Sequence, residues 1–215
     1  MTRVSLMTAA CALVLAACSG GSDAPEEEAA TGAVEGDTDT AAAPAETSPS
    51  PVDAILAEAR ACELPEEAEI PLIDEPEETR NPMANAAQAD AYIASVQDEA
   101  CMFELPSGLV LRIRDAVEEG VSPITGDMVT VHYRGMFPWG TEFDSSYARE
   151  EPATFPSDRL IRGWVEALPL MRTGETWELY IKPELGYGAR GTQGGPIGPN
   201  QALVFQLELL DVPGR

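Results

Sequence analysis

The sequence has few basic residues, one histidine and few aromatic residues. Its 215 residues contain 13 Lys and Arg against 37 Asp and Glu, a formal net charge of −24. Because nucleic-acid binding depends on many cationic contacts to phosphate, this balance argues against nucleic acid as a partner. The histidine, His132, has no partner identifiable from the sequence and is a poor candidate for a catalytic base. The length excludes a large multidomain protein.

Aromatic residues make up only 6% of the chain, which also contains 18 Pro and 18 Gly, so we expect part of it never to pack. Residues 18–51 contain no aromatic residue and no periodic apolar set, which predicts a disordered tether. The stretch Ser19–Glu78 holds 18 acidic residues and one basic residue. We interpret this charge as solvation of an extended segment; the alternative, a cation-binding tail, lacks the spacing of a calcium loop.

A long hydrophobic run is also lacking. The longest, Leu6–Ala17, is about a dozen residues, shorter than the ~20 that cross a bilayer, so residues 1–17 are interpreted as a cleavable signal peptide. The run ends in Leu15-Ala16-Ala17-Cys18, which resembles the lipobox of bacterial lipoproteins. The resemblance implies lipid attachment at Cys18, and Ser19 in place of Asp favours the outer membrane over the inner. An ordinary secretory signal that happens to contain Cys18 is the alternative.

The chain has only four cysteines. If Cys11 leaves with the signal and Cys18 is lipidated, the remaining thiols are Cys62 and Cys101. In an oxidising envelope this favours a structural disulfide between them. Two buried free cysteines are the alternative, and a redox pair is disfavoured because the wide spacing lacks a Cys-x-x-Cys motif.

Residues 52–101 are expected to form a small helical accessory segment. A short Ala-rich helix is predicted over Val52–Cys62. A second opens with Asn81 as N-cap and Pro82 at its first position, and carries an apolar stripe that needs a packing surface. The prolines and acidic residues between the helices predict an extended loop over Pro65–Pro82. The sequence does not decide what the segment packs against.

Residues 102–215 are different, because apolar residues alternate with polar ones. Strands are predicted around Leu109–Ile113, Val129–Tyr133, Trp177–Ile181 and Leu203–Leu209. Turn signals between them favour antiparallel connections. One short helix is predicted, capped by Ser157 or Asp158, running through Leu168 and ended by Pro169. Several strands around one helix indicate an α+β domain.

Within this domain, five motifs follow one another over about a hundred residues. They are Val131-His132-Tyr133-Arg134-Gly135, Phe143-Asp144-Ser145-Ser146, Leu160-Ile161-Arg162-Gly163-Trp164, Gly186-Tyr187-Gly188 and Leu203-Val204-Phe205-Gln206-Leu207-Glu208-Leu209-Leu210. Their order and approximate spacing resemble FK506-binding-protein-type (FKBP-type) peptidyl-prolyl cis-trans isomerases, over about Gly108–Val212. The resemblance implies a curved antiparallel β-sheet wrapped around one short α-helix, with an apolar pocket between them that receives a proline side chain.

The resemblance also implies the site residues. Catalytic roles are carried over to Asp144, Tyr187, Ile161, Trp164 and Phe205. Substrate-binding roles are carried over to Tyr133, Phe143, Arg149, Phe155, Leu160 and Ile197. In this pattern Trp164 is the pocket floor, the backbone N–H of Ile161 meets a ligand carbonyl, and Arg149 pairs with Asp144.

The implied activity is rotation about X-Pro bonds in exported proteins, which needs no nucleophile, metal or cofactor. Proline-containing proteins are the implied substrates and FK506-like macrolides the implied ligands, for a monomer facing the periplasm. The runner-up function is a binding module or chaperone that holds proline segments without turnover. Two departures bear on the rate: Ala153 replaces a frequent aromatic, with Phe155 nearby, and the loop Gly194–Pro199 has Gly198 where a proline is usual.

Overall fold

The computed structural model describes residues 49–215, so the expected signal peptide, Cys18 and nearly all of the expected tether lie outside the described residues. Seven strands form one antiparallel sheet in the order β1-β2-β6-β7-β3-β4, and β5 pairs with β3 on the same side as β4. The strands are β1 Phe103–Glu104, β2 Val110–Asp115, β3 Met128–Met136, β4 Glu142–Ser145, β5 Ala153–Pro156, β6 Thr176–Ile181 and β7 Leu203–Asp211. The helices are α1 Pro51–Ala61, α2 Pro82–Val96 and α3 Arg162–Ala167, with short 3₁₀ turns at Leu168–Leu170, Pro183–Leu185 and Gly188–Arg190.

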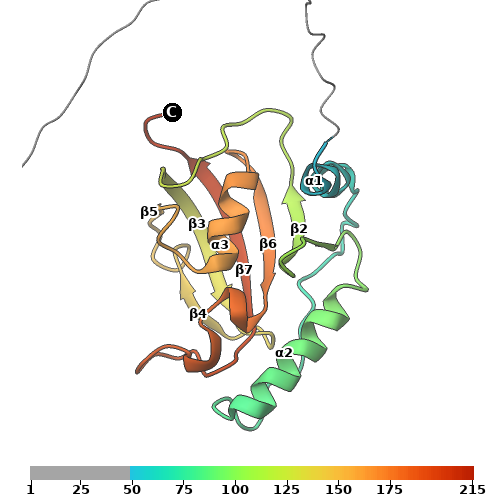
Figure 1. Ribbon diagram of the computed structural model, residues 1–215, viewed down its shortest axis with the longest axis vertical. Coiled ribbons are helices and arrows are strands. Elements are labelled where there is room, and N and C mark those ends of the chain that lie inside the picture. Colours follow the sequence, from blue (N-terminus) through green and yellow to red (C-terminus); the bar gives the residue numbers. More distant parts are fainter. Residues whose placement is uncertain (1–48) are drawn as a thin grey trace, which may run out of the picture. The chain divides into compact units, whose positions relative to one another are not determined.

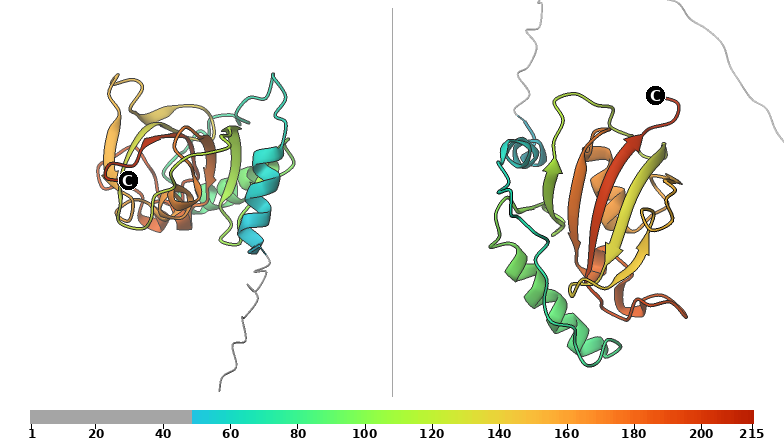
Figure 2. Two further views of the ribbon diagram at one scale, coloured as in Figure 1. Left: turned by 90° about the horizontal axis from the view of Figure 1, so that it is seen from above. Right: turned by 180° about the vertical axis from the view of Figure 1, so that it is seen from behind.

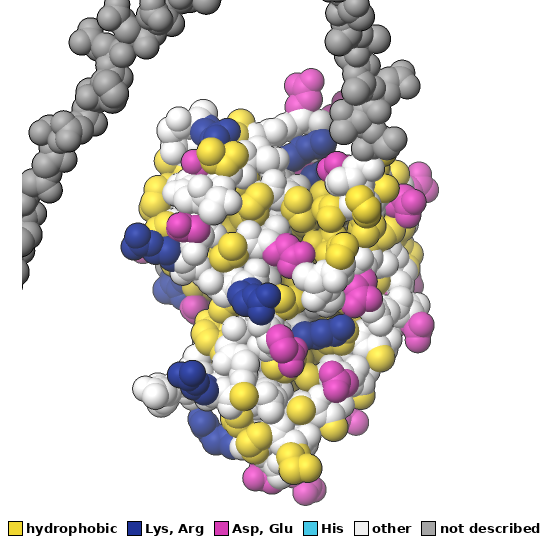
Figure 3. Space-filling view, viewed as in Figure 1, with side chains coloured by type: hydrophobic (Ala, Val, Ile, Leu, Met, Phe, Trp, Pro, Cys, Tyr) yellow, Lys and Arg dark blue, Asp and Glu magenta, His cyan; other side chains and the backbone are white. Residues whose placement is uncertain are grey.

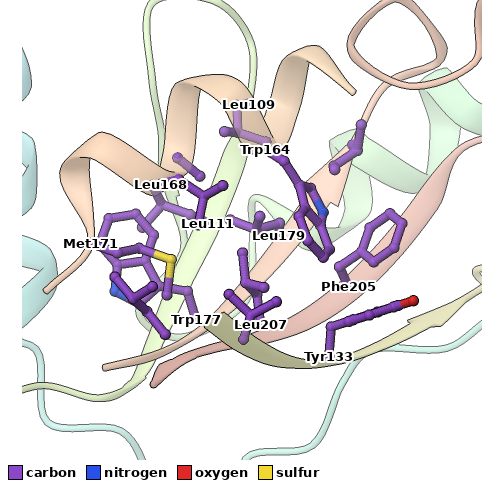
Figure 4. Close-up of a cluster of buried hydrophobic side chains, with 14 of the residues drawn as sticks. Leu109, Leu111, Tyr133, Trp164, Leu168, Met171, Trp177, Leu179, Phe205 and Leu207 are labelled. Atoms are coloured by element: carbon purple, nitrogen blue, oxygen red, sulfur yellow. The ribbon is translucent and has the colours of Figure 1, made fainter. Parts of the chain in front are cut away.

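The alternating apolar residues of the strands face α3, as the sequence predicts, and the α+β class is confirmed. Figure 1 shows α3 lying across one face of β3, β7 and β6. Trp164 and Leu168 at this helix share one core cluster with Leu111, Leu179 and Leu207 of the sheet. Figure 4 shows these side chains interleaved between the helix and the strands beneath it.

The start of α3 differs from the prediction. The expected cap at Ser157 or Asp158 is wrong, because the helix begins at Arg162 with Ile161 as N-cap and no side-chain cap. The hydroxyl of Ser157 instead accepts from Gly126 N–H at 3.0 Å and donates to the Ile124 carbonyl. This tertiary pairing keeps residues 157–161 out of the helix. The α-helix ends at Ala167, one residue earlier than expected, and Pro169 lies in the 3₁₀ turn that follows.

The accessory segment covers the opposite face of the sheet. Both predicted helices are confirmed, with Asn81 accepting from Met83 and Ala84 N–H at the start of α2. Between the helices, residues 62–81 form no helix or strand, as expected. The apolar stripe of α2 packs on strand residues that point away from α3. This second cluster contains Ala89, Tyr92, Ile93, Val96, Val110, Met136, Tyr180, Ala202 and Val204.

The other helix, α1, packs at the edge of the sheet. Figures 1 and 2 show it beside β2, and its Leu56 and Ala59 belong to the core cluster under α3. The described accessory segment remains acidic on its surface. On the face seen in Figure 3, acidic side chains gather on the side of α1 and α2, whereas most basic side chains lie over the rest of the unit. Within residues 49–215, no helix is both long and apolar enough to cross a membrane.

Buried ion pairs join the accessory segment to the sheet. Glu178 of β6 accepts from Arg112 and Arg114 of β2, and these arginines also donate to the carbonyls of Glu69 and Ala68. At the other end of β6, the buried carboxylate of Glu175 accepts from Arg60 of α1 at 2.7 Å. A buried charge is costly unless it is paired, so Glu175 depends on α1 staying in place, whereas Glu178 is paired within the sheet.

A disulfide joins Cys62, directly after α1, to Cys101, two residues before β1. It closes a loop with a sequence separation of 39 residues, which contains all of α2. In the chain-entropy model a loop of this length stabilises the folded state by roughly 4 kcal/mol. The disulfide therefore fastens both ends of the segment that covers the second face of the sheet.

Replacing both cysteines, Cys62→Ser with Cys101→Ser, is expected to lower the free energy of unfolding by about 2–4 kcal/mol, because the unfolded chain regains loop entropy. Urea denaturation followed by tryptophan fluorescence measures the change. The unmodified protein with reductant serves as the control and should match the double variant. Two titratable thiols in the folded, unreduced protein would contradict the bridge.

Candidate active site

A cavity of about 530 Å³ opens at one end of the core, between the sheet and the start of α3. Side chains from four strands, from the start of α3 and from the segment after β6 converge on it. It is lined by Tyr133, Phe143, Asp144, Phe155, Arg159, Leu160, Ile161, Arg162, Trp164, Gly186, Tyr187 and Phe205. Nine of the residues expected from the sequence are therefore brought together. The cavity is mainly aromatic, with a few polar groups at its rim, as is typical of small-molecule and peptide sites.

Trp164 forms the centre of the aromatic wall. Its ring lies edge-on to Tyr133 and to Phe205, with ring centroids 5.3 Å apart in both cases. Phe205 in turn meets Phe143 at 5.6 Å, and Phe155 lies 6.5 Å from Trp164. Figure 4 shows Trp164, Phe205 and Tyr133 together at one end of the buried cluster. Edge-to-face packing favours such rings beyond their burial, so the wall is rigid.

Gly135 lies behind this wall and was missed as a site residue. It pairs with Asp144 of β4 on one side and with Phe205 of β7 on the other. A Cβ added here would lie 2.7 Å from ring carbons of both Phe143 and Phe205. The signal was present in the sequence, because a glycine inside a strand pattern often marks a close approach of neighbouring groups.

Asp144, Tyr133 and Arg149 form a hydrogen-bonded cluster at the rim. Tyr133 Oη donates to Asp144 Oδ2 at 2.6 Å, and Arg149 donates to both the Tyr133 hydroxyl and the Asp144 carboxylate. The break between β4 and β5 allows this contact, since it turns residues 146–152 back towards β3. Arg149 therefore holds Asp144, as expected, but does not line the cavity itself.

The cluster keeps Asp144 ionised. Partial burial acts to raise the pKa of this carboxyl, but the hydrogen bonds from Tyr133 and Arg149 outweigh it and hold the pKa below its ordinary value. Burial raises the pKa of Tyr133, and the bond to Asp144 raises it further. A carboxylate and a neutral phenol therefore face the cavity throughout the physiological range.

Two hydrogen-bond donors stand free at the rim. The N–H of Ile161, at the N-cap of α3, has no acceptor within residues 49–215. Tyr187 is 41% exposed, and its hydroxyl likewise has no acceptor in this part of the chain. Burial raises the pKa of Tyr187 and the nearby charge of Asp144 adds to the effect, so the phenol stays protonated as a donor.

One expected substrate-binding residue lies elsewhere. Ile197 does not line the cavity; it is 4% exposed and belongs to the core cluster. Its N–H donates to Thr192 Oγ1 and its carbonyl accepts from Thr192 N–H, which turns the side chain of this loop residue inward. Arg159, Arg162 and Gly186 line the cavity although no role was predicted for them.

A second cavity of about 520 Å³ lies on the other face of the sheet, under residues 68–72. Its lining includes Arg114, Arg134, Glu178 and Gln206. Arg114 pairs with Glu178, and Arg134 donates to Gln206 at 3.0 Å. These four side chains are thus paired with one another, although the buried Nε of Arg134 has no hydrogen-bond partner among the described residues. Within the described residues, no cluster of His, Cys, Asp and Glu forms a metal site.

Comparison with known proteins agrees with this geometry. Residues 120–210 match the family model of the FKBP-type peptidyl-prolyl cis-trans isomerases. The fold is similar to the crystal structure of a peptidyl-prolyl cis-trans isomerase from Pseudomonas syringae pv. tomato, with 32% identity, a TM-score of 0.56, and 65% of this chain and 98% of that one covered. The chain belongs to the FKBP-type family.

Further relatives support the FKBP-type assignment. Peptidyl-prolyl cis-trans isomerase Mip of Coxiella burnetii is 43% identical over 128 residues, which cover 60% of this chain and 55% of that one. The FKBP-type 22 kDa isomerase of Escherichia coli is 45% identical over 129 residues, covering 60% and 62%. The crystal structure of Escherichia coli FkpA gives 40% identity and a TM-score of 0.58, covering 61% and 60%. The chain thus spans little more than half the length of these curated relatives. The FKBP-type family and fold expected from the sequence are confirmed.

Tyr133→Phe is expected to raise the pKa of Asp144, because the variant removes a donor to the ionised carboxylate and keeps the ring. The lowered pKa of Asp144 stabilises the folded state above the pKa that this carboxyl has in the unfolded chain, and this stabilisation is lost as the pH falls through its pKa in the folded protein. Because the folded pKa is higher in the variant, the variant loses this stabilisation at a higher pH. NMR titration of the carboxyl carbon measures the shift. Tyr147→Phe is the control, since that hydroxyl bonds Glu208 instead. An unchanged pKa in Tyr133→Phe would contradict the cluster.

Proposed function

We propose that this FKBP-type domain accelerates cis-trans rotation of X-Pro bonds. The observation that carries the proposal is the cavity with an aromatic wall around Trp164 and a free backbone donor, Ile161 N–H, at its rim. The cavity has the size and apolar lining to take a proline ring, and the N–H can meet the carbonyl next to it. The names of the relatives support the same activity.

Rotation about an X-Pro bond makes and breaks no covalent bond, so the protein has only to stabilise the twisted amide. Rotation about an X-Pro bond faces a barrier of about 20 kcal/mol, because the planar amide must lose resonance. A twisted amide has less charge separation than a planar one, so transfer from water into an apolar cavity favours the transition state. Each ~1.4 kcal/mol of preferential stabilisation speeds the reaction tenfold.

The polar groups have positioning roles in this proposal. Ile161 N–H and Tyr187 Oη hold the substrate carbonyls while the bond rotates. Asp144, fixed by Tyr133 and Arg149, supplies a negative charge beside the cavity. This charge is preorganised, so no reorganisation is needed as the amide twists. Phe143, Phe155, Leu160 and Phe205 enclose the proline ring.

A protease-coupled isomerisation assay on proline tetrapeptides tests the proposal. Tyr187→Phe is expected to lower kcat/KM by roughly tenfold, because it removes one donor to the rotating peptide. Tyr147→Phe is the matched control: the side chain is 38% exposed, similar to Tyr187, but lies outside the cavity. Asp144→Asn should likewise lower kcat/KM without unfolding the domain.

A well-folded protein that binds proline peptides without accelerating their rotation would overturn the enzyme and favour the binding module. Equal activity of Tyr187→Phe and Tyr147→Phe would remove Tyr187 from the mechanism.

We also propose a place in the bacterial cell envelope. The chain would be held by lipid on Cys18, preferably at the outer membrane and facing the periplasm, with residues 18–51 as tether. One relative, from Legionella longbeachae, is named outer membrane protein MIP. Exported proline-containing proteins would be the substrates and FK506-like macrolides ligands. A monomer is expected because the stripe of α2 is buried on the chain's own sheet; light scattering at twice the monomer mass would contradict it.

Cys18→Ala is expected to abolish membrane attachment, because the thiol that accepts the lipid is gone. Fractionation of a bacterial host that expresses the full chain measures this, and Cys11→Ala is the matched control that leaves attachment intact. Mass spectrometry of the mature protein should show a chain beginning at a diacylated Cys18. An unmodified Cys18, or a soluble mature protein, would contradict the anchor.

A further inference from the structure

The loop Gly191–Asn200 is held from outside by the accessory segment. Asn85 of α2 is 1% exposed, and its Nδ2 donates to the carbonyls of both Thr79 and Pro199, at 2.9 and 2.8 Å. Arg80 donates to the carbonyl of Gly195 at 3.0 Å. From the other side, Asn200 Nδ2 donates to the Pro82 carbonyl at 3.0 Å. Three hydrogen bonds thus tie residues 80–85 to this loop.

Gly198 shows how closely the two segments approach. A Cβ added here would overlap the carbonyl oxygen of Thr79 and lie 3.2 Å from Asn85 Nδ2. A shift of the Thr79 backbone away from the loop would break the bond from the buried Asn85 amide to its carbonyl. Only glycine fits. The unusual residue in the loop is therefore explained by the contact with the accessory segment.

The same loop is joined to the cavity. The N–H of Asn200 donates to the Gly188 carbonyl at 2.9 Å, and Gly188 directly follows Tyr187, which lines the cavity. Further along, Ile197 packs in the core cluster that contains Trp164 and Phe205. A shift of the Pro199–Asn200 backbone would therefore act on Tyr187 through Gly188, and on the core cluster behind the aromatic wall through Ile197.

We infer that Asn85 is a positioning residue for substrate binding, acting through the Pro199 carbonyl on the loop Gly191–Asn200 and through it on Tyr187. The inference rests on the proposed isomerase function for its effect on substrate. The accessory segment is then part of the binding site, although it contributes no side chain to the cavity wall. The hydrogen bonds from the accessory segment to the loop are present in the folded chain whether or not the protein catalyses the reaction.

The test compares Asn85→Ala in the full-length protein with Tyr92→Phe. Asn85→Ala removes two hydrogen bonds of a buried α2 side chain, whereas Tyr92→Phe removes one, from the Tyr92 hydroxyl to the Pro71 carbonyl, away from the loop. Hydrogen exchange followed by mass spectrometry measures the loop amides, and the assay separates KM from kcat. Asn85→Ala is expected to speed exchange over residues 191–200 by about tenfold and to raise KM by roughly fivefold, whereas Tyr92→Phe changes neither.

A merely structural role gives a different result. If Asn85→Ala only lowered the folded fraction, apparent kcat would fall with KM unchanged, and exchange would rise throughout the chain. Unchanged exchange of residues 191–200, or an unchanged KM, would overturn the inference. Arg80→Ala, an exposed variant that cannot unfold α2, should give a smaller change in the same direction and keeps the test open if Asn85→Ala fails to fold. Absence of turnover in the unmodified protein would reject the proposed function, while the exchange of the loop would still decide whether Asn85 positions it.

Discussion

All six residues of β6, Thr176–Ile181, are buried, and the rest of the structure follows from covering both faces of this strand. Leu179 and its neighbours on one face are covered by α3, as in any sheet wrapped on a helix. Tyr180 on the other face needs the stripe of α2. An antiparallel sheet commonly leaves one face exposed to water, whereas here α2 and the residues before it cover the second face. The disulfide keeps them there at both ends.

Charged residues of β6 and its approach bind this cover to the sheet. Glu178 points to the covered face and Glu175 lies just before the strand, and each is paired by arginine. A buried ion pair seldom stabilises a fold more than apolar residues would, but removing one partner is costly, at about 3–5 kcal/mol. The Arg60–Glu175 pair therefore selects one placement of α1, because a displaced helix would leave Glu175 buried without a charged partner. Glu178 would keep Arg112 and Arg114 of β2, which would lose only their bonds to the Glu69 and Ala68 carbonyls.

The site lies where the core opens at the start of α3. Trp164, Tyr133 and Phe205 pack against each other, and the N–H of the N-cap residue Ile161 has no acceptor within residues 49–215. The same placement of α2 that covers the sheet brings Asn85 to the loop after Tyr187. The inferred role of Asn85 links fold stability and substrate binding through one segment, which the family model, matched over residues 120–210, does not include.

The sequence by itself determined strands β2, β3, β6 and β7 and both accessory helices, because period-2 alternation and the Asn81-Pro82 start are local signals. The short strands β1, β4 and β5 show no such alternation and were not predicted. Motifs in register also pointed to nine of the residues that line the cavity. It did not determine the start of α3, where Ser157 bonds Gly126 instead of capping. Nor did it place Ile197, Gly135 or Asn85. Their roles depend on contacts between segments far apart in the chain, and only the tertiary structure decides which buried polar group finds which partner.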